Sequence, residues 1–315
     1  MIKNNLHNTH KGYVAGLLSA IFFGCSGLFV KNAQSSGLDS ISILVLQYII
    51  MIPTLWSISF FKYRNYIKID KKDLLKLFLI GMFLQSSVSR CYYESFKYLD
   101  ISIATILLFT YPIIVTILSP ILGKSKLNKI IILSVAIAFI GCILILDLFH
   151  TDASFPLKGV LLGLGGALFL ALSNMCLETF ESRIPPFVLL SYTSTAIFLN
   201  FLIFSFPSNL LHQSISSSQW INIALLAFIC QIPPTTLMLT AIQYIGAIKT
   251  AIIGNAEIPA AAILGYVFYG ETLNLLQIIG VFFVIGGILL MQNSEYVQSK
   301  LAAIKLKPSH QKHST

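Results

Sequence analysis

Ionisable side chains inside long apolar runs are the residues of this sequence that can do chemistry, because a charge at such a place is costly and marks a functional site. Glu257 lies in the run 248–269, two residues before Pro259. Pro259 removes a helix hydrogen bond and frees a nearby carbonyl, and Asn255 belongs to the same polar break. Glu257 is therefore the candidate for binding and releasing a proton. The alternative is a protonated carboxyl that bonds a neighbouring helix.

A second ionisable pair lies in the run 74–96. Arg90 and Glu94 are one helical turn apart on the same helix face. Arg90 can hold a substrate carboxylate, or the pair can neutralise itself near the end of the run, where long side chains reach water. Tyr93 and Tyr111 can line a cavity, although aromatic residues at this depth usually serve packing.

Small polar residues beside helix-weakening residues are the third group. Ser173 and Asn174 lie in a run rich in glycine and alanine, while Gln231 and Thr235 flank two consecutive prolines. Broken helices can expose backbone groups to a ligand. Each side chain could equally form a helix–helix hydrogen bond worth about 1 kcal/mol.

Catalytic and metal-binding patterns are not expected. The six histidines all lie outside the apolar runs, and the five cysteines are scattered within them, which fits packing better than a disulfide framework or a metal site. Gly123-Lys124-Ser125 looks like the end of a phosphate-binding loop, but the motif needs glycine where the chain has Leu118. We expect no enzyme activity, no catalytic residue, no metal and no cofactor.

The composition requires a membrane environment. Of the 315 residues 56% are hydrophobic and 10% charged, whereas a soluble domain carries about a quarter charged residues. The apolar surplus must face lipid. The net charge of +9 comes from basic residues in short segments between the apolar runs, so we expect the lipid bilayer and not nucleic acid as the partner.

The apolar runs predict an all-α integral membrane protein with ten transmembrane helices. The expected spans are 13–31, 41–61, 74–96, 101–122, 128–147, 158–178, 186–206, 219–243, 248–269 and 273–292. With a tail at 1–12 and a basic tail at 293–315 both in the cytoplasm, the outside segments hold only Lys31, Lys97 and Lys158. This positive-inside bias favours a multi-pass protein of the cell (inner) membrane in that orientation.

The two halves of the chain repeat each other at a shift of 147 residues. Lys11, Gly12, Gly16, Ala20, Phe22 and Ser26 fall on Lys158, Gly159, Gly163, Ala167, Phe169 and Ser173; Ala104, Pro112 and Gly123 fall on Ala251, Pro259 and Gly270; and Tyr98 matches Tyr244 with a one-residue slip. The halves 13–147 and 158–292 each hold five expected spans, so the second enters the membrane from the opposite side. Such inverted repeats are typical of secondary transporters.

These features resemble the drug/metabolite transporter superfamily in its ten-helix EamA form. The second half carries the family pattern in Tyr244, Pro259, Gly270-Glu271 and Gly286-Gly287, while Gly123-Lys124 replaces the usual Gly-Glu in the first half. The resemblance implies a secondary carrier of two EamA-like repeats, often an exporter of amino acids or related metabolites.

Several functions therefore stay open. The leading hypothesis is a secondary transporter that exports a small organic solute, such as an amino acid or related metabolite, by alternating access, with protons as a possible coupling ion. The resemblance also allows uptake of a nucleotide-like metabolite such as S-adenosylmethionine. An intramembrane enzyme, a passive channel and a structural membrane subunit are alternatives of other classes. The sequence leaves open whether the chain is a monomer or a dimer.

Overall fold

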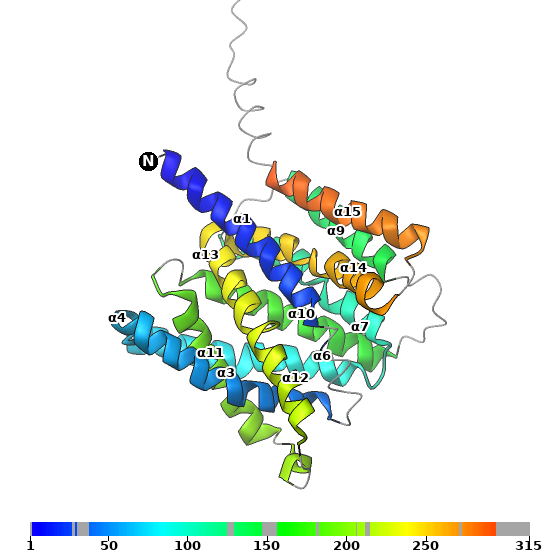
Figure 1. The fold of residues 1–315 in the computed structure, drawn as a ribbon. Coiled ribbons are helices and arrows are strands. Elements are labelled where there is room, and N and C mark those ends of the chain that lie inside the picture. Colours follow the sequence, from blue (N-terminus) through cyan, green and yellow to red (C-terminus); the bar gives the residue numbers. More distant parts are fainter. Residues whose placement is uncertain are drawn as a thin grey trace, which may run out of the picture.

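The computed structural model describes residues 2–26, 29, 38–124, 129–146, 156–180, 183–205, 207–211, 215–270 and 273–293, and these contain helices and no strand (Figure 1). The helices are α1 (Ile2–Gly24), α3 (Ser40–Lys62), α4 (Arg64–Ile67), α5 (Lys71–Leu79), the π-helix η1 (Ile80–Gln85), α6 (Ser86–Ser95), α7 (Ile101–Leu108), α8 (Tyr111–Ile121), α9 (Lys129–Ile145), α10 (Leu157–Glu178), α11 (Pro186–Phe204), the 3-10 helix η3 (Ser208–Leu211), α12 (Ser217–Phe228), α13 (Ile232–Gly254), α14 (Glu257–Tyr269) and α15 (Leu275–Gln292).

Seven helical segments within the described residues are long and apolar enough to cross a membrane. The shorter helices α9 and α14 are apolar as well. Helix α1 begins at Ile2, so helical structure extends into the region expected to be the N-terminal tail. The C-terminal tail expected at 293–315 lies outside the described residues, except for Asn293.

Helix α13 crosses the gap expected between the spans 219–243 and 248–269. Its backbone bends at Gly246, where φ is +82°. A residue with a side chain is strained at this φ, and glycine is not. The label α13 thus covers two helices joined at Gly246, and this break lies within the gap that the sequence predicts between the two spans.

Two further breaks occur at corresponding places in the two halves. Phe109 and Thr110 separate α7 from α8, and Asn255 and Ala256 separate α13 from α14. Pro112 and Pro259 follow these breaks. Because proline cannot donate the backbone hydrogen bond to the carbonyl four residues earlier, each break is built into the sequence.

Helix α1 packs against α13 and α14, whereas α10 packs against η1, α6, α7 and α8. Glycine residues allow α1 and α10 to pack closely against these helices. A Cβ atom on Gly12 would lie 2.7 Å from Ile245, and a Cβ atom on Gly159 would lie 2.7 Å from Leu99. The first helix of each half thus packs closely on helices of the other half.

Helices α9 and α15 lie side by side along one edge of the molecule (Figure 1). A Cβ atom on Gly141 would lie 2.7 Å from the carbonyl oxygen of Gly280, and one on Gly287 would lie 2.8 Å from that of Ser134. Backbone contact of this kind is how small residues join helices in membranes. Helices α1, α10, α13 and α14 lie between this pair and α3, α11 and α12 (Figure 1).

Candidate functional site

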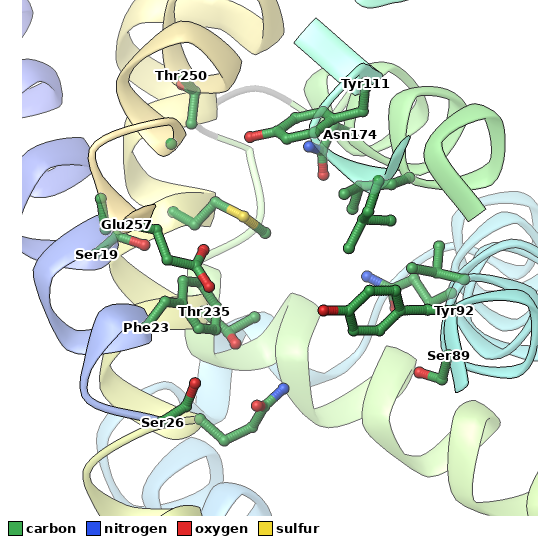
Figure 2. A pocket seen from close by; sticks show the side chains of 18 of the residues that line it. Ser19, Phe23, Ser26, Ser89, Tyr92, Tyr111, Asn174, Thr235, Thr250 and Glu257 are labelled. Atoms are coloured by element: carbon green, nitrogen blue, oxygen red, sulfur yellow. The ribbon is translucent and has the colours of Figure 1, made fainter. Parts of the chain in front are cut away.

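A cavity of about 370 Å³ lies among the helices, within the size range of small-molecule sites. Its walls come from α1, α3, η1, α6, α7, α8, α10, α11, α13 and α14, so both halves of the chain contribute. Polar and aromatic side chains from these helices are directed into it (Figure 2). The cavity is therefore the place where the fold brings polar side chains of the two halves together.

Irregular backbone surrounds the cavity. Phe109 and Tyr111 line it at the break between α7 and α8, and Gly254 and Glu257 line it at the break between α13 and α14. Gln85 lines it at the end of the π-helix η1. Interrupted helices at membrane depth are tolerated where they are buried or line a cavity, and π-helical turns are frequent at functional sites.

Glu257 supplies the carboxyl group of the cavity. It is the first residue of α14, and Figure 2 shows its side chain directed into the cavity. The side chain forms no hydrogen bond or ion pair with any residue that the structure describes. Tyr92 and Tyr111 enter from the opposite wall. The carboxyl group is therefore available to a proton or to a ligand.

Several hydroxyl groups of the cavity donate hydrogen bonds to backbone carbonyls. Ser19 donates to Pro234 over 2.7 Å, Thr105 to Ile101 over 2.7 Å, Tyr111 to Ala251 over 3.2 Å and Thr250 to Gly246 over 2.8 Å. The Tyr92 and Thr105 hydroxyl oxygens lie 2.9 Å apart, and because the Thr105 proton is engaged, Tyr92 is the donor. These oxygens offer the cavity lone pairs rather than protons.

Buried polar atoms without a partner also gather at the cavity. They are Gln85 Oε1, Asn174 Oδ1, Ser194 Oγ and Thr235 Oγ1, which come from η1, α10, α11 and α13. A buried polar atom without a hydrogen bond costs about 1–3 kcal/mol, so such atoms are rare in folded proteins. Their convergence on one cavity is the arrangement that a polar ligand would satisfy.

Half of the residues proposed from the sequence line the cavity. They are Tyr111, Asn174, Gln231, Thr235 and Glu257. Gln231 precedes the first turn of α13 and Thr235 follows four residues later, a spacing that places both side chains on the same helix face.

Arg90 and Glu94 are not among the residues that line the cavity, and they do not pair with each other. The Arg90 guanidinium donates to Asn200 Oδ1 over 2.9 Å and lies 5.8 Å from the centre of the Phe204 ring. Glu94 pairs with Lys97, with 2.7 Å between the charged atoms. The Arg90–Glu94 pairing considered from the sequence is thus replaced by two separate contacts.

The other three proposed residues lie close to the cavity but outside its lining. The Tyr93 ring packs against those of Tyr92 and Phe96. Ser173 and Asn255 are buried, and neither side chain has a hydrogen-bond partner. Ser173 directly precedes the lining residue Asn174. Because adjacent positions on a helix face different directions, the Ser173 side chain does not line the cavity.

Sequence reasoning missed several lining residues that follow helical spacing. Gly16, Ser19, Ala20, Phe23 and Ser26 of the first apolar run all line the cavity. A second set, Gln85, Val88, Ser89 and Tyr92, has the same three- and four-residue steps. A stripe of small and polar residues on an otherwise apolar helix is the signal that identifies such a face.

Comparison with known proteins identifies similar chains. The EamA-like transporter family matches residues 10–147 and 157–292. An uncharacterized transporter of Archaeoglobus fulgidus is 24% identical over 283 residues, which cover 89% of this chain and 95% of the relative. The uncharacterized transporter YcbK of Bacillus subtilis is 25% identical over 327 residues, covering 90% and 95%. One crystal structure shares the fold with a TM-score of 0.72 and 13% identity, covering 89% of this chain and 96% of that one.

Proposed function

Because the chain belongs to the EamA-like transporter family of the drug/metabolite transporter superfamily, and so is a multi-pass membrane transporter, we propose that it is a secondary transporter of a small organic solute. The solute crosses the cell (inner) membrane by alternating access, in the direction of export, and both termini lie in the cytoplasm. The observation that carries the proposal is the cavity between the two halves, with Glu257 as its carboxyl group.

Reciprocal contacts support ten spans arranged as two inverted repeats. Gly12 meets Ile245 as Gly159 meets Leu99. The Gly141–Gly280 approach between α9 and α15 has its counterpart in Gly287–Ser134. Two halves related by a pseudo-twofold axis form their contacts in such pairs, and each can adopt the conformation of the other, which is a physical route to alternating access.

The lining of the cavity follows the same repeat. Gln85 corresponds to Gln231 and Ser89 to Thr235, with the one-residue slip that also relates Tyr98 to Tyr244. Equivalent positions of both halves thus face one space, which is where the substrate site of an inverted-repeat transporter lies. Because Pro112 falls on Pro259, the first half has Thr110 at the position of Glu257, so the two halves differ in their acid–base chemistry.

Glu257 is the proposed proton-coupling residue. The cavity lining places Tyr92 of α6 and Tyr111 of α8 opposite Glu257, and its described residues include no lysine, arginine or histidine. A carboxylate without a cationic partner can exchange a proton with whichever side of the membrane the cavity faces. Proton binding and solute binding at one cavity then couple the two gradients.

The test is solute flux in proteoliposomes that contain the purified protein, under an imposed pH gradient. The solutes are labelled amines, amino acids and nucleotide-like metabolites. We expect saturable flux that depends on the gradient and falls at least about tenfold in Glu257→Gln, whose side chain has the same size but no charge. The control is Asp70→Asn, which removes an exposed carboxylate between α4 and α5.

Flux that ignores the pH gradient and is equal in Glu257→Gln would contradict proton coupling through this residue. Absence of flux for every solute would contradict the transport proposal and favour the structural or enzymatic alternatives. Preference for a nucleotide-like metabolite would select the uptake alternative.

A further inference from the structure

The cavity lining has an acidic side chain and no basic one among its described residues. Glu257 is its carboxylate, and no lysine, arginine or histidine is among its described lining residues. The nearest candidate along the sequence, Arg90, follows the lining residue Ser89 but directs its guanidinium to Asn200 and Phe204. An anionic group entering this cavity would therefore meet Glu257 without a cationic side chain to compensate it.

Four hydroxyl groups of the lining favour the same sign of charge, whereas its amide side chains and the Ser194 and Thr235 hydroxyls can donate as well as accept. The hydroxyl groups at four lining positions already donate hydrogen bonds to backbone carbonyls, so each oxygen presents its lone pairs to a ligand. These residues are Ser19, Thr105, Tyr111 and Thr250. A protonated amine carries only donors and is complementary to such a lining. A carboxylate or phosphate carries only acceptors, and these four hydroxyl oxygens offer it no proton.

Aromatic rings complete the lining. Phe23, Tyr48, Tyr92, Phe109 and Tyr111 contribute to the walls, and Tyr92 and Tyr111 reach into the cavity from the wall opposite Glu257 (Figure 2). Aromatic faces attract cations and also pack against an apolar body. The site thus combines one anion with hydroxyl oxygens and rings.

We propose that the cavity selects an organic ammonium ion, that is, a protonated amine on an apolar body without a carboxylate or phosphate group. Its nitrogen binds Glu257 and the hydroxyl oxygens of Tyr92 and Tyr111, and its body packs against the rings. This inference rests on the proposed function for the site, and it narrows the solute from amino acids in general to amines. A zwitterionic amino acid is excluded because its carboxylate has no cationic partner in the lining.

The experiment measures binding rather than flux. The purified protein in lipid nanodiscs is titrated calorimetrically with a matched series that shares one apolar body: 2-phenylethylamine, 2-phenylethanol, 3-phenylpropionate and phenylalanine. Butylamine and cyclohexylamine, each with its own carboxylate, vary the body. We expect at least one amine to bind, with its carboxylate, alcohol and zwitterionic analogues at least about tenfold weaker, since a hydrogen bond to a charged group is lost.

Variants locate the charge selectivity. Glu257→Gln is expected to weaken amine binding by about tenfold to a hundredfold and to abolish the difference between amine and alcohol. Glu257→Asp keeps the charge and should keep the preference, which protects the test if Glu257→Gln folds poorly. Asp70→Asn should bind as the unmodified protein does.

Tighter binding of a carboxylate or zwitterion than of its amine would overturn the inference, and so would equal amine binding by Glu257→Gln. Failure of every amine to bind would overturn it as well. Selective amine binding without flux would leave the inference standing and contradict the proposed transport. Coupled flux of zwitterions without amine binding would support the proposed transport and overturn the inference of an amine site.

Discussion

At the scale of single residues, Arg90 is part of a hydrogen-bond chain that joins three helical segments. Its guanidinium donates to Asn200 Oδ1 over 2.9 Å, and Asn200 Nδ2 donates to the Met82 carbonyl over 2.8 Å. Met82 lies in the π-helix η1, whose altered hydrogen bonding makes such a carbonyl available. Arg90 and Asn200 thus hold α6 and η1 against α11, next to the cavity.

Substitution of Asn200 by alanine is expected to destabilise the protein by about 1–3 kcal/mol, because the guanidinium and the Met82 carbonyl both lose a partner. Arg90→Lys should act in the same direction, since an ammonium group cannot reproduce the planar guanidinium geometry. The measurement is the melting temperature of the detergent-solubilised protein, together with KM for transport. A KM increase limited to carboxylate solutes in Arg90→Lys and absent in Asn200→Ala would instead identify Arg90 as a substrate ligand.

At the scale of elements, the bend in α13 is stabilised by the end of α10. The Glu178 carboxylate accepts a hydrogen bond from the Ala247 backbone N–H over 3.0 Å, directly after Gly246. Lys124 donates to the Met175 carbonyl and lies 3.4 Å from the other Glu178 oxygen. A carboxylate beside the first free N–H of a helical segment is a favourable cap, so Glu178 defines where the second part of α13 begins.

Loss of this cap should lower stability in a graded manner. Glu178→Ala leaves the Ala247 N–H unpaired and is expected to cost about 1–2 kcal/mol, whereas Glu178→Gln keeps an acceptor oxygen and should cost less. Gly246→Ala adds backbone strain of about 1–3 kcal/mol at positive φ, and its Cβ would lie 2.7 Å from Glu178 Oε1. Melting temperatures of the variants in detergent give the order of their stabilities. Equal melting temperatures of Glu178→Ala and Glu178→Gln would contradict the cap.

At the scale of the whole molecule, the distribution of lysine and arginine predicts which ends of the helices face the cytoplasm. Lys72 lies in α5, where it follows an exposed and basic segment, while Lys97 follows α6 at the other end of the same expected span. Both side chains are exposed. The positive-inside bias places Lys72 in the cytoplasm and Lys97 outside.

Cysteine labelling in cells tests this orientation. In a background without the five native cysteines, Lys97→Cys should react with a membrane-impermeant maleimide in intact cells, and Lys72→Cys only after permeabilisation. The reversed pattern would invert the proposed topology. Labelling of both from the same side would contradict the span 74–96.

The sequence by itself determined the membrane environment, the helical class, the repeat and the candidate carboxyl group Glu257. Composition, the spacing of breakers such as Pro112 and Pro259, and the cost of a charge in an apolar run are local properties that need no knowledge of neighbours. For the same reason, Gln231 and Thr235 could be selected from the prolines beside them.

Only the tertiary structure decided which face of each helix borders the cavity. Ser19 and Tyr92 line it, whereas Arg90 turns to Asn200 and Ser173 is buried away from the lining. Lipid tails and a protein interior are about equally apolar, so hydrophobic periodicity distinguishes the two faces of a membrane helix poorly. Close packing at positions such as Gly12 and Gly159 fixes the rotation of each helix, and that packing depends on partners far away in the sequence.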